Sequence, residues 1–503
     1  MKEFGDFQTN SLLSSKVCKL LLELGVNPSV IIEPTCGEGN FLLAANSQFK
    51  NCKKILGIEL QKHYIEKIKD KISSDKKINQ NIEIINADVF DYDFGNISLK
   101  EDDRILLIGN PPWVTNSNLN GKNLPKKSNF KKNNGLDAIT GKANFDISEF
   151  ILLHLFESFK KNKGHSAFLC KTQVARNIIE FLPSTDLDIN NIKIYEFDSM
   201  KEFNVSVDAC LFYCEFGNKV KSYQCEVYKL DESEKMLRKF GWHENKFISD
   251  LTKYKKIQKL DGVSQLVWRS GIKHDCSAIM ELTKSKKLNF KNKIDNEINI
   301  EDNYIFPLLK SSNLKGGVLN QSDKYIIVTQ KKPGEDTAVI SKDSPKLWHY
   351  LNSHKTLFDK RKSVIYKKNP IFSIFGIGDY SFKPYKIAVS GLYKKPSFTL
   401  LLPQNKKTIM VDDSCYILSF DNLKNALITF AILNSKEVSD LLESIVFLDS
   451  KRPYTKNILM RIDIKNVLNE LTFQDIIDFL KKRGLFLEDI NKKDYNHFLN
   501  SLE

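Results

Sequence analysis

Four short apolar segments lie within the first 115 residues, and each ends in a glycine turn, an acidic residue or a proline turn. They occupy residues 30–33, 54–60, 82–90 and 105–109, and each has the apolar run of a buried strand. Strands that alternate with helical sequence form a doubly wound, mostly parallel sheet of the α/β class. Such sheets bind ligands at the carboxyl ends of their strands. We therefore expect the polar residues after the four segments to line one site.

The fourth segment ends in Gly-Asn-Pro-Pro-Trp, which restricts the backbone strongly. Pro111 and Pro112 cannot donate to a strand ladder, and Pro111 restricts Asn110 to extended geometry, so the strand must stop here. The Asn110 amide and the backbone carbonyls then offer hydrogen-bond acceptors, and Trp113 offers a large aromatic face. Acceptors beside an aromatic face suit a planar ring that carries an exocyclic amine.

Methylation of a base amine needs such acceptors. The lone pair of adenine N6 or cytosine N4 is delocalised into the ring, and acceptors that hold the two amine hydrogens localise it for in-line attack. The residues Asn110, Pro111, Pro112 and Trp113 resemble the fourth motif, Asn/Asp/Ser-Pro-Pro-aromatic, of amino-methyltransferases that use S-adenosylmethionine. The resemblance implies that these residues are catalytic, that Trp113 stacks on the target base, and that Asn110 also lies beside the cofactor.

The turn after the first segment contains Gly37 and Gly39, and glycines let a backbone approach a ligand closely. A dinucleotide fingerprint would place a third glycine at Leu42, so a nicotinamide-dependent dehydrogenase is disfavoured. Acidic side chains beside this turn would repel phosphate and suit a cationic sulfonium. The turn resembles the first methyltransferase motif, which implies cofactor contacts for Glu33, Thr35, Gly37 and Gly39.

Four more residues complete the cofactor site that the resemblance implies. Glu59 ends the second strand, where an acid can accept both ribose hydroxyls. Asp88 and Phe90 end the third segment, and the family pattern assigns them to the adenine ring. Thr9 precedes an amphipathic helix, where it either contacts the methionine carboxylate or simply caps the helix.

The resemblance also places two residues around the target base. Asp146 begins a helix in a stretch like the fifth motif, and Phe203 lies in a stretch like the eighth motif. An aromatic side chain there faces the base from the side opposite Trp113, although core packing is an alternative for Phe203. The polar segment 116–144 contains Lys126 and Lys127 and is either a DNA clamp or a flexible insertion.

The positive charge lies in the second half of the chain. Residues 1–242 contain 33 Lys and Arg against 32 Asp and Glu, whereas residues 243–503 contain 43 against 30. We therefore expect a catalytic domain over residues 1–242 and a mixed α+β DNA target-recognition domain over residues 243–503, with a helical segment at its end. Its candidate DNA contacts are Lys367, Lys368, Lys383, Lys386, Lys451 and Arg452.

The motif order resembles that of the gamma-type DNA adenine-N6 methyltransferases of bacterial restriction-modification systems, through about Gly217. The resemblance implies S-adenosylmethionine as cofactor and a flipped-out adenine in double-stranded DNA as substrate. It also implies a monomer and, unless the enzyme is an orphan, a separately encoded restriction endonuclease.

Four alternatives stay open. Cytosine-N4 enzymes also use Trp at the position of Trp113, and RNA adenine or protein glutamine methylation uses the same motif. A non-catalytic DNA-binding module is the alternative from another class.

Neither a membrane nor a metal is expected as a partner. No apolar run approaches the roughly 18 residues that span a bilayer, and the first residues lack a signal-like apolar core, which predicts a cytoplasmic protein. The nine cysteines include no Cys-x-x-Cys pair, which favours reduced thiols in the core over a zinc site.

Overall fold

The computed structural model describes residues 7–74, 78, 81–114, 146–284, 289–295, 297–485 and 490–502. The chain divides into two compact units, Met1–Thr252 and Lys253–Glu503. The boundary lies ten residues beyond the predicted position, because β9 (Arg238–His243) and β10 (Lys246–Ile248) form a hairpin that extends the sheet of the first unit. Lys126 and Lys127 lie outside the described residues.

The first unit is built on a ten-stranded sheet in the order β10-β9-β8-β6-β7-β5-β4-β1-β2-β3. Its central strands are all parallel: β1 (Val30–Glu33), β2 (Lys54–Glu59), β3 (Ile82–Asn86), β4 (Arg104–Gly109) and β5 (Lys163–Lys171). An antiparallel β7 (Ala209–Phe216) lies between β5 and β6 (Ile189–Phe197), and β6 pairs with β8 (Gln224–Lys229). This confirms the predicted doubly wound, mostly parallel sheet.

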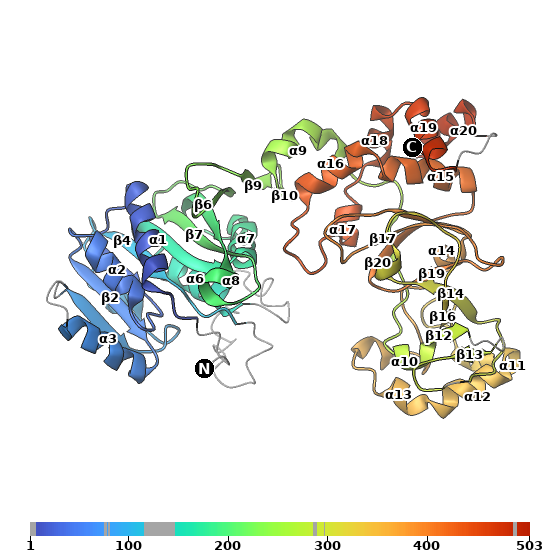
Figure 1. Cartoon of the computed structure of the whole chain (residues 1–503), viewed down its shortest axis with the longest axis horizontal. Helices are drawn as coiled ribbons and strands as arrows, with labels where there is room; N and C mark the ends of the chain where they lie inside the picture. The colour runs from blue at the N-terminus through green and yellow to red at the C-terminus, as the bar shows by residue number, and fades with distance from the viewer. Residues whose placement is uncertain are drawn as a thin grey trace. The chain divides into compact units, whose positions relative to one another are not determined.

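Helices connect these strands and cover the sheet (Figure 1). They are α1 (Ser11–Glu23), α2 (Asn40–Gln48), α3 (Lys62–Ser74), α6 (Ile147–Ser158), α7 (Thr172–Phe181) and α8 (Ser199–Phe203). All four residues of β1 and the last five of β4 are buried, as expected for strands covered on both faces. The strand order reverses between β1 and β4, and such a switch point opens a crevice at the carboxyl ends.

The second unit contains two five-stranded sheets and is of the predicted mixed α+β type (Figure 1). One sheet consists of β11 (Arg269–Ser270), β15 (Gly317–Leu319), β17 (Tyr385–Ser390), β18 (Thr399–Leu401) and β20 (Cys415–Phe420). The other consists of β12 (Glu281–Lys284), β13 (Phe290–Lys291), β14 (Ile305–Leu309), β16 (Lys324–Ile327) and β19 (Met410–Val411).

Helices gather at both ends of this unit. One group contains four short helices: α10 (Ser277–Met280), α11 (Ile340–Asp343), α12 (Pro345–Ser353) and α13 (Lys355–Asp359). A further short helix, α14 (Asp379–Phe382), precedes β17. The C-terminal group contains α15 (Leu423–Leu433), α16 (Lys436–Ile445), α17 (Lys456–Leu459), α18 (Ile464–Glu470), α19 (Phe473–Lys482) and α20 (Lys492–Asn500). Because α15 contacts β17, β18, α19 and α20, it joins the terminal helices to the sheet.

A buried ion pair fastens the start of the second unit to its C-terminal helices. Arg461 donates through Nε and Nη2 to the two oxygens of Asp261, at 3.0 and 2.6 Å, and the Tyr254 hydroxyl donates to the same carboxylate at 2.6 Å. Tyr254 lies in α9 (Leu251–Ile257). A bidentate pair with every oxygen satisfied is the arrangement that makes a buried carboxylate tolerable.

The cysteines are buried free thiols. Within the described ranges, no helix combines the length and the apolar character that a membrane crossing requires.

Candidate active site

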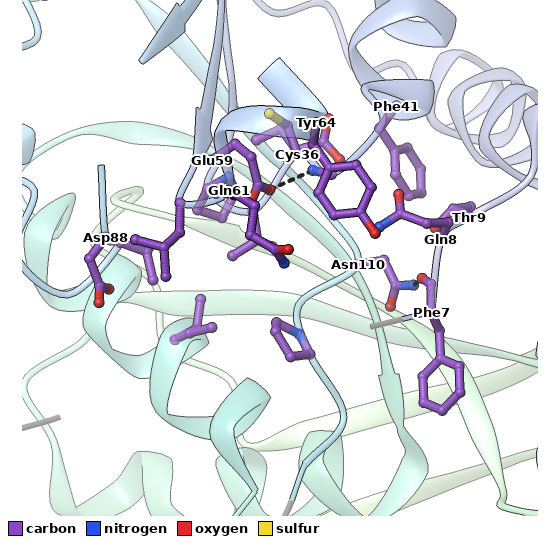
Figure 2. A pocket seen from close by; sticks show the side chains of 18 of the residues that line it. Phe7, Gln8, Thr9, Cys36, Phe41, Glu59, Gln61, Tyr64, Asp88 and Asn110 are labelled. Carbon is purple, nitrogen blue, oxygen red and sulfur yellow. Dashed lines mark hydrogen bonds between the residues drawn. The ribbon is translucent and has the colours of Figure 1, made fainter. Parts of the chain in front are cut away.

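A cavity of about 440 Å³ lies at the carboxyl edge of the first sheet, at the switch point between β1 and β4 (Figure 2). Nine of the predicted site residues line it: Thr9, Glu33, Thr35, Gly37, Glu59, Asp88, Phe90, Asn110 and Pro112. Gly39, Pro111, Trp113, Asp146 and Phe203 are not among the lining residues. The strand-end residues are thus brought together at one site.

The glycine turn needs glycine at both predicted positions. Gly37 has φ +50°, and a Cβ there would lie 2.5 Å from the Gln8 Oε1 atom. Gly39 has φ +75° and forms the N-cap of α2. Because left-handed backbone is unfavourable for other residues, both positions favour glycine, and of the two only Gly37 lines the cavity.

Glu59 holds the glycine turn from the neighbouring strand. Its Oε2 accepts a hydrogen bond from the Gly37 amide at 2.8 Å (Figure 2), and its Oε1 accepts one from the Gln61 amide at 2.8 Å. The carboxylate therefore binds the turn and faces the cavity at the same time.

Two polar atoms at the end of β1 and in the following turn are buried without a hydrogen-bond partner among the described residues. They are Glu33 Oε2 and Thr35 Oγ1. Burial raises the pKa of Glu33 well above its usual value, and the nearby Glu59 raises it further. The cavity lining contains three acidic side chains and, among the described residues, no Lys or Arg. The raised pKa favours the neutral form of Glu33, so the negative charge of the lining comes from Glu59 and Asp88, and it favours a cationic ligand.

Asp88 and Phe90 form one wall of the cavity after β3. Asp88 Oδ1 accepts a hydrogen bond from the Phe90 amide at 3.0 Å, which fixes a tight turn. The Phe90 ring packs edge-to-face on Phe150, with ring centroids 5.9 Å apart. The wall thus combines a carboxylate and an aromatic ring.

The segment before α1 crosses the cavity, and the sequence reasoning identified only part of it. Asn10 is the N-cap of α1, because its side chain accepts from the Leu13 amide at 2.8 Å. Thr9 is therefore not the cap, and it lines the cavity instead. Its carbonyl accepts from Asn40 Nδ2 at 2.7 Å, and Gln8 Oε1 accepts from the Glu38 amide at 2.9 Å.

Asn110 is held by this segment in one orientation (Figure 2). Its Nδ2 donates to the Phe7 carbonyl at 2.8 Å. Its Oδ1 is buried and has no hydrogen-bond partner among the residues that the structure describes. Because the amide nitrogen is already engaged, the oxygen is the atom left to bind a donor at the cavity. Phe7 and Gln8 were missed, although Phe-Gln-Thr immediately precedes the helix cap.

Trp113 does not offer the open aromatic face that was predicted. It is 5% exposed, and its Nε1 donates to the Leu169 carbonyl at 3.3 Å. The Phe203 ring meets it edge-on, with centroids 5.2 Å apart and planes at 73°, and the Phe7 ring lies 5.8 Å away. In this arrangement Phe203 contacts Trp113 directly instead of facing it across a slot.

The prediction for Asp146 is corrected by its hydrogen bonds. Its Oδ1 caps α6 by accepting from the Ser148 amide at 3.1 Å, and its Oδ2 forms an ion pair with Lys171 at 2.6 Å. Both oxygens are thus used within the protein, and the residue does not line the cavity. Its role here is to begin a helix.

The predicted DNA contacts separate into exposed and buried residues. Lys367, Lys368, Lys451 and Arg452 are exposed. Lys383 is half-buried and pairs with Asp421 at 2.7 Å.

Lys386 is a correction, because it is 1% exposed. It donates to the Thr408 hydroxyl and, at 2.9 Å, to the Ile409 carbonyl, and burial lowers its pKa to about 7. A side chain in that position cannot reach a phosphate.

The sheet order and the strand-end cavity define the first unit as a class I methyltransferase fold. The profile of the N-6 DNA Methylase family matches residues 1–176. The chain is 45% identical over 469 residues to the type II methyltransferase M.NspV of Nostoc sp. (strain ATCC 29411 / PCC 7524), covering 92% of this chain and 96% of that protein. The chain therefore belongs to the DNA methyltransferases of type II restriction-modification systems.

A solved structure resembles the whole chain in fold. The type IIL restriction-modification enzyme MmeI, determined in complex with DNA, matches with a TM-score of 0.54 at 12% identity. The match covers 98% of this chain and 71% of MmeI. At this identity the likeness concerns the fold alone.

Proposed function

We propose that this protein transfers a methyl group from S-adenosylmethionine to N6 of a flipped-out adenine at a specific site in double-stranded DNA. The observation that carries the proposal is the buried Oδ1 of Asn110, which lacks a partner among the described residues and lies at the cavity. An unpaired buried acceptor is costly unless a donor arrives to satisfy it. The amine of a base is such a donor.

The residues around the cavity fit S-adenosylmethionine. In this proposal Glu59 would accept from the ribose hydroxyls, and Asp88 with Phe90 would offer a carboxylate and a ring to the adenine moiety, because all three residues line the cavity. Glu33 and Thr35 supply polar atoms that lack partners within the described ranges, where the methionine part would bind. The bound cofactor would supply an activated methyl group on a positively charged sulfur.

The chemical contribution of the chain is to hold the amine. Asn110 Oδ1 and the Pro111 carbonyl would accept the two N–H groups of the target amine, which localises its lone pair. Phe7 supports this by occupying Asn110 Nδ2, so that the acceptor oxygen faces the substrate. The amine lone pair would form the new carbon–nitrogen bond, the electron pair of the carbon–sulfur bond would stay with the departing thioether, and the amine proton would leave to water, so no general base would be needed.

Adenine is favoured over cytosine by the N-6 DNA Methylase profile, although Trp113 suits either base. The proposal is tested by incubating the protein with S-adenosylmethionine labelled in its methyl group and with DNA, RNA or protein as acceptor. Label is expected in double-stranded DNA. Transfer only to RNA or protein would overturn the proposed substrate.

The second unit is proposed to bind the DNA target. Exposed basic side chains such as Lys367, Lys368 and Lys451 support this role, because phosphate contacts dominate DNA affinity. MmeI, which shares the fold, was solved with DNA. The proposal includes action as a monomer in the cytoplasm beside a separately encoded endonuclease.

Exposed and buried lysines should affect the salt dependence of DNA binding differently. Changing Lys367 and Lys368 together to Ala should reduce the slope of log affinity against log salt by about 1.8, because each phosphate contact contributes roughly 0.9. Lys386→Met should leave the slope unchanged, because its ammonium is buried. Filter binding to duplex DNA from 50 to 200 mM salt measures both. An equal loss in the two variants would contradict the assignment.

A further inference from the structure

Three aromatic rings from distant parts of the first unit form a cluster beside the cavity. The centroid of the Phe7 ring lies 5.8 Å from that of Trp113 and 6.2 Å from that of Phe203, and the Trp113 and Phe203 centroids are 5.2 Å apart. Trp113 is buried, so each of its faces is covered in this structure. A base can stack on Trp113 only if one of the covering side chains moves.

Of the three residues in this cluster, Phe7 lines the cavity, whereas Trp113 and Phe203 do not. Its carbonyl accepts from Asn110 Nδ2, on the same amide whose Oδ1 lacks a partner among the described residues (Figure 2). A base that stacks on Trp113 and donates its amine to Asn110 Oδ1 must lie against both of these residues. Phe7 contacts both of them.

We propose that the Phe7 ring occupies the place of the target base and is displaced when a base enters, so that the base site is bounded by Trp113, Phe203 and Asn110. This rests on the proposed function, which gives the base its place between Trp113 and Phe203, and it adds Phe7 as the residue that fills this place when no base is bound. The proposed ligand is a planar heterocycle with an exocyclic amine. Its ring can stack on Trp113, and its amine can donate to Asn110 Oδ1.

Phe7 is the ring placed to move. Phe203 ends α8, whose first turn is fixed by Asp198 Oδ1, which accepts from the Met200 amide at 2.9 Å. It also packs on Phe197, with centroids 6.1 Å apart. Phe7 lies outside any helix or strand, and its ring can turn about the Cα–Cβ bond while its carbonyl keeps the bond to Asn110. Displacement of the ring therefore leaves the acceptor in place.

The test measures binding of free bases to the full-length protein. The probes are 2-aminopurine, followed by quenching of its fluorescence, and adenine and cytosine, followed by calorimetry. Phe7→Ala opens the space beside Trp113 and should bind 2-aminopurine about tenfold more tightly than the unaltered protein, because stacking on an exposed ring becomes available. Adenine should gain more affinity than cytosine, because adenine is the proposed target base.

Phe197→Ala is the matched control, because Phe197 packs on Phe203 and is not among the residues that line the cavity. It should bind 2-aminopurine as weakly as the unaltered protein. If circular dichroism shows that Phe7→Ala is unfolded, Phe7→Leu replaces it, with an expected gain of about threefold. Equal binding by the unaltered protein and a folded Phe7 variant would overturn the inference.

The outcome is separable from that of the proposed function. Unaltered protein that transfers labelled methyl to DNA, together with no gain in the Phe7 variants, would remove only the role of Phe7. Absence of methyl transfer by the unaltered protein would overturn the proposed function instead.

Discussion

Replacing Asn110 with Ala is expected to lower the turnover number by about 10²–10³-fold while DNA affinity stays within about twofold. Removal of one preorganised hydrogen-bond donor that stabilises a transition state typically costs that factor, and we expect a similar loss for a preorganised acceptor. In this protein the acceptor is the Asn110 Oδ1 atom, which has no other partner in the described part of the chain. Single-turnover kinetics with labelled S-adenosylmethionine gives the rate, and a gel shift gives the affinity.

Asn86→Ala is a suitable control for this variant. Asn86 also uses its amide nitrogen on main-chain carbonyls, those of Glu59 and Leu60, both at 2.9 Å, but it does not line the cavity. Its turnover should stay within a few-fold of the unaltered enzyme. Near-normal turnover in Asn110→Ala would remove the proposed mechanism.

The second large effect is expected at Glu59. Glu59→Ala should weaken binding of S-adenosylmethionine about a hundredfold, because a charged acceptor at the cavity is lost together with the bond to the Gly37 amide. Isothermal titration calorimetry measures the dissociation constant. The thermal stabilisation by added S-adenosylmethionine should shrink in parallel.

Glu83→Ala supplies the comparison for Glu59. Glu83 lies on the neighbouring strand β3, is exposed, and pairs with Lys54 at 2.8 Å. Its loss should leave cofactor affinity unchanged, since a surface ion pair contributes little. If Glu59→Ala and Glu83→Ala bind the cofactor equally well, Glu59 has no role at the cofactor site.

The strand-end residues could be predicted because their placement follows from backbone topology. Parallel strands bring Glu33, Glu59, Asp88 and Asn110 to one edge of the sheet, whatever the details of side-chain packing. Glycine and proline residues indicate turns, and short apolar runs indicate buried strands, so both features predict the course of the backbone. The α/β class and the cavity therefore followed from local sequence.

Side-chain burial could not be predicted in the same way, because it depends on distant neighbours. Asp146 meets Lys171 only through the fold, and this pairing removes it from the base site. Lys386 lies in a strand that is buried over five of its six residues, where a hydroxyl and carbonyls satisfy its ammonium. A lysine-rich sequence does not reveal which lysine is enclosed.

At the candidate active site, too, the burial of Trp113 by Phe7 could not be predicted from the sequence. The motif places an aromatic residue after the two prolines, but the motif does not state what covers its ring. Phe7 lies 106 positions earlier in the chain and reaches Trp113 through tertiary packing. The arrangement that holds the Asn110 amide was therefore visible only in the structure.

If Asn110 presents an adenine amine for methylation, cells that express the unaltered protein should contain N6-methyladenine in their DNA, and cells that express Asn110→Ala should contain none above background. Nucleoside mass spectrometry of digested DNA from the two cultures measures both bases. N4-methylcytosine in place of N6-methyladenine would show that the target base is not adenine. Equal N6-methyladenine in both cultures would show that Asn110 is not needed for the transfer.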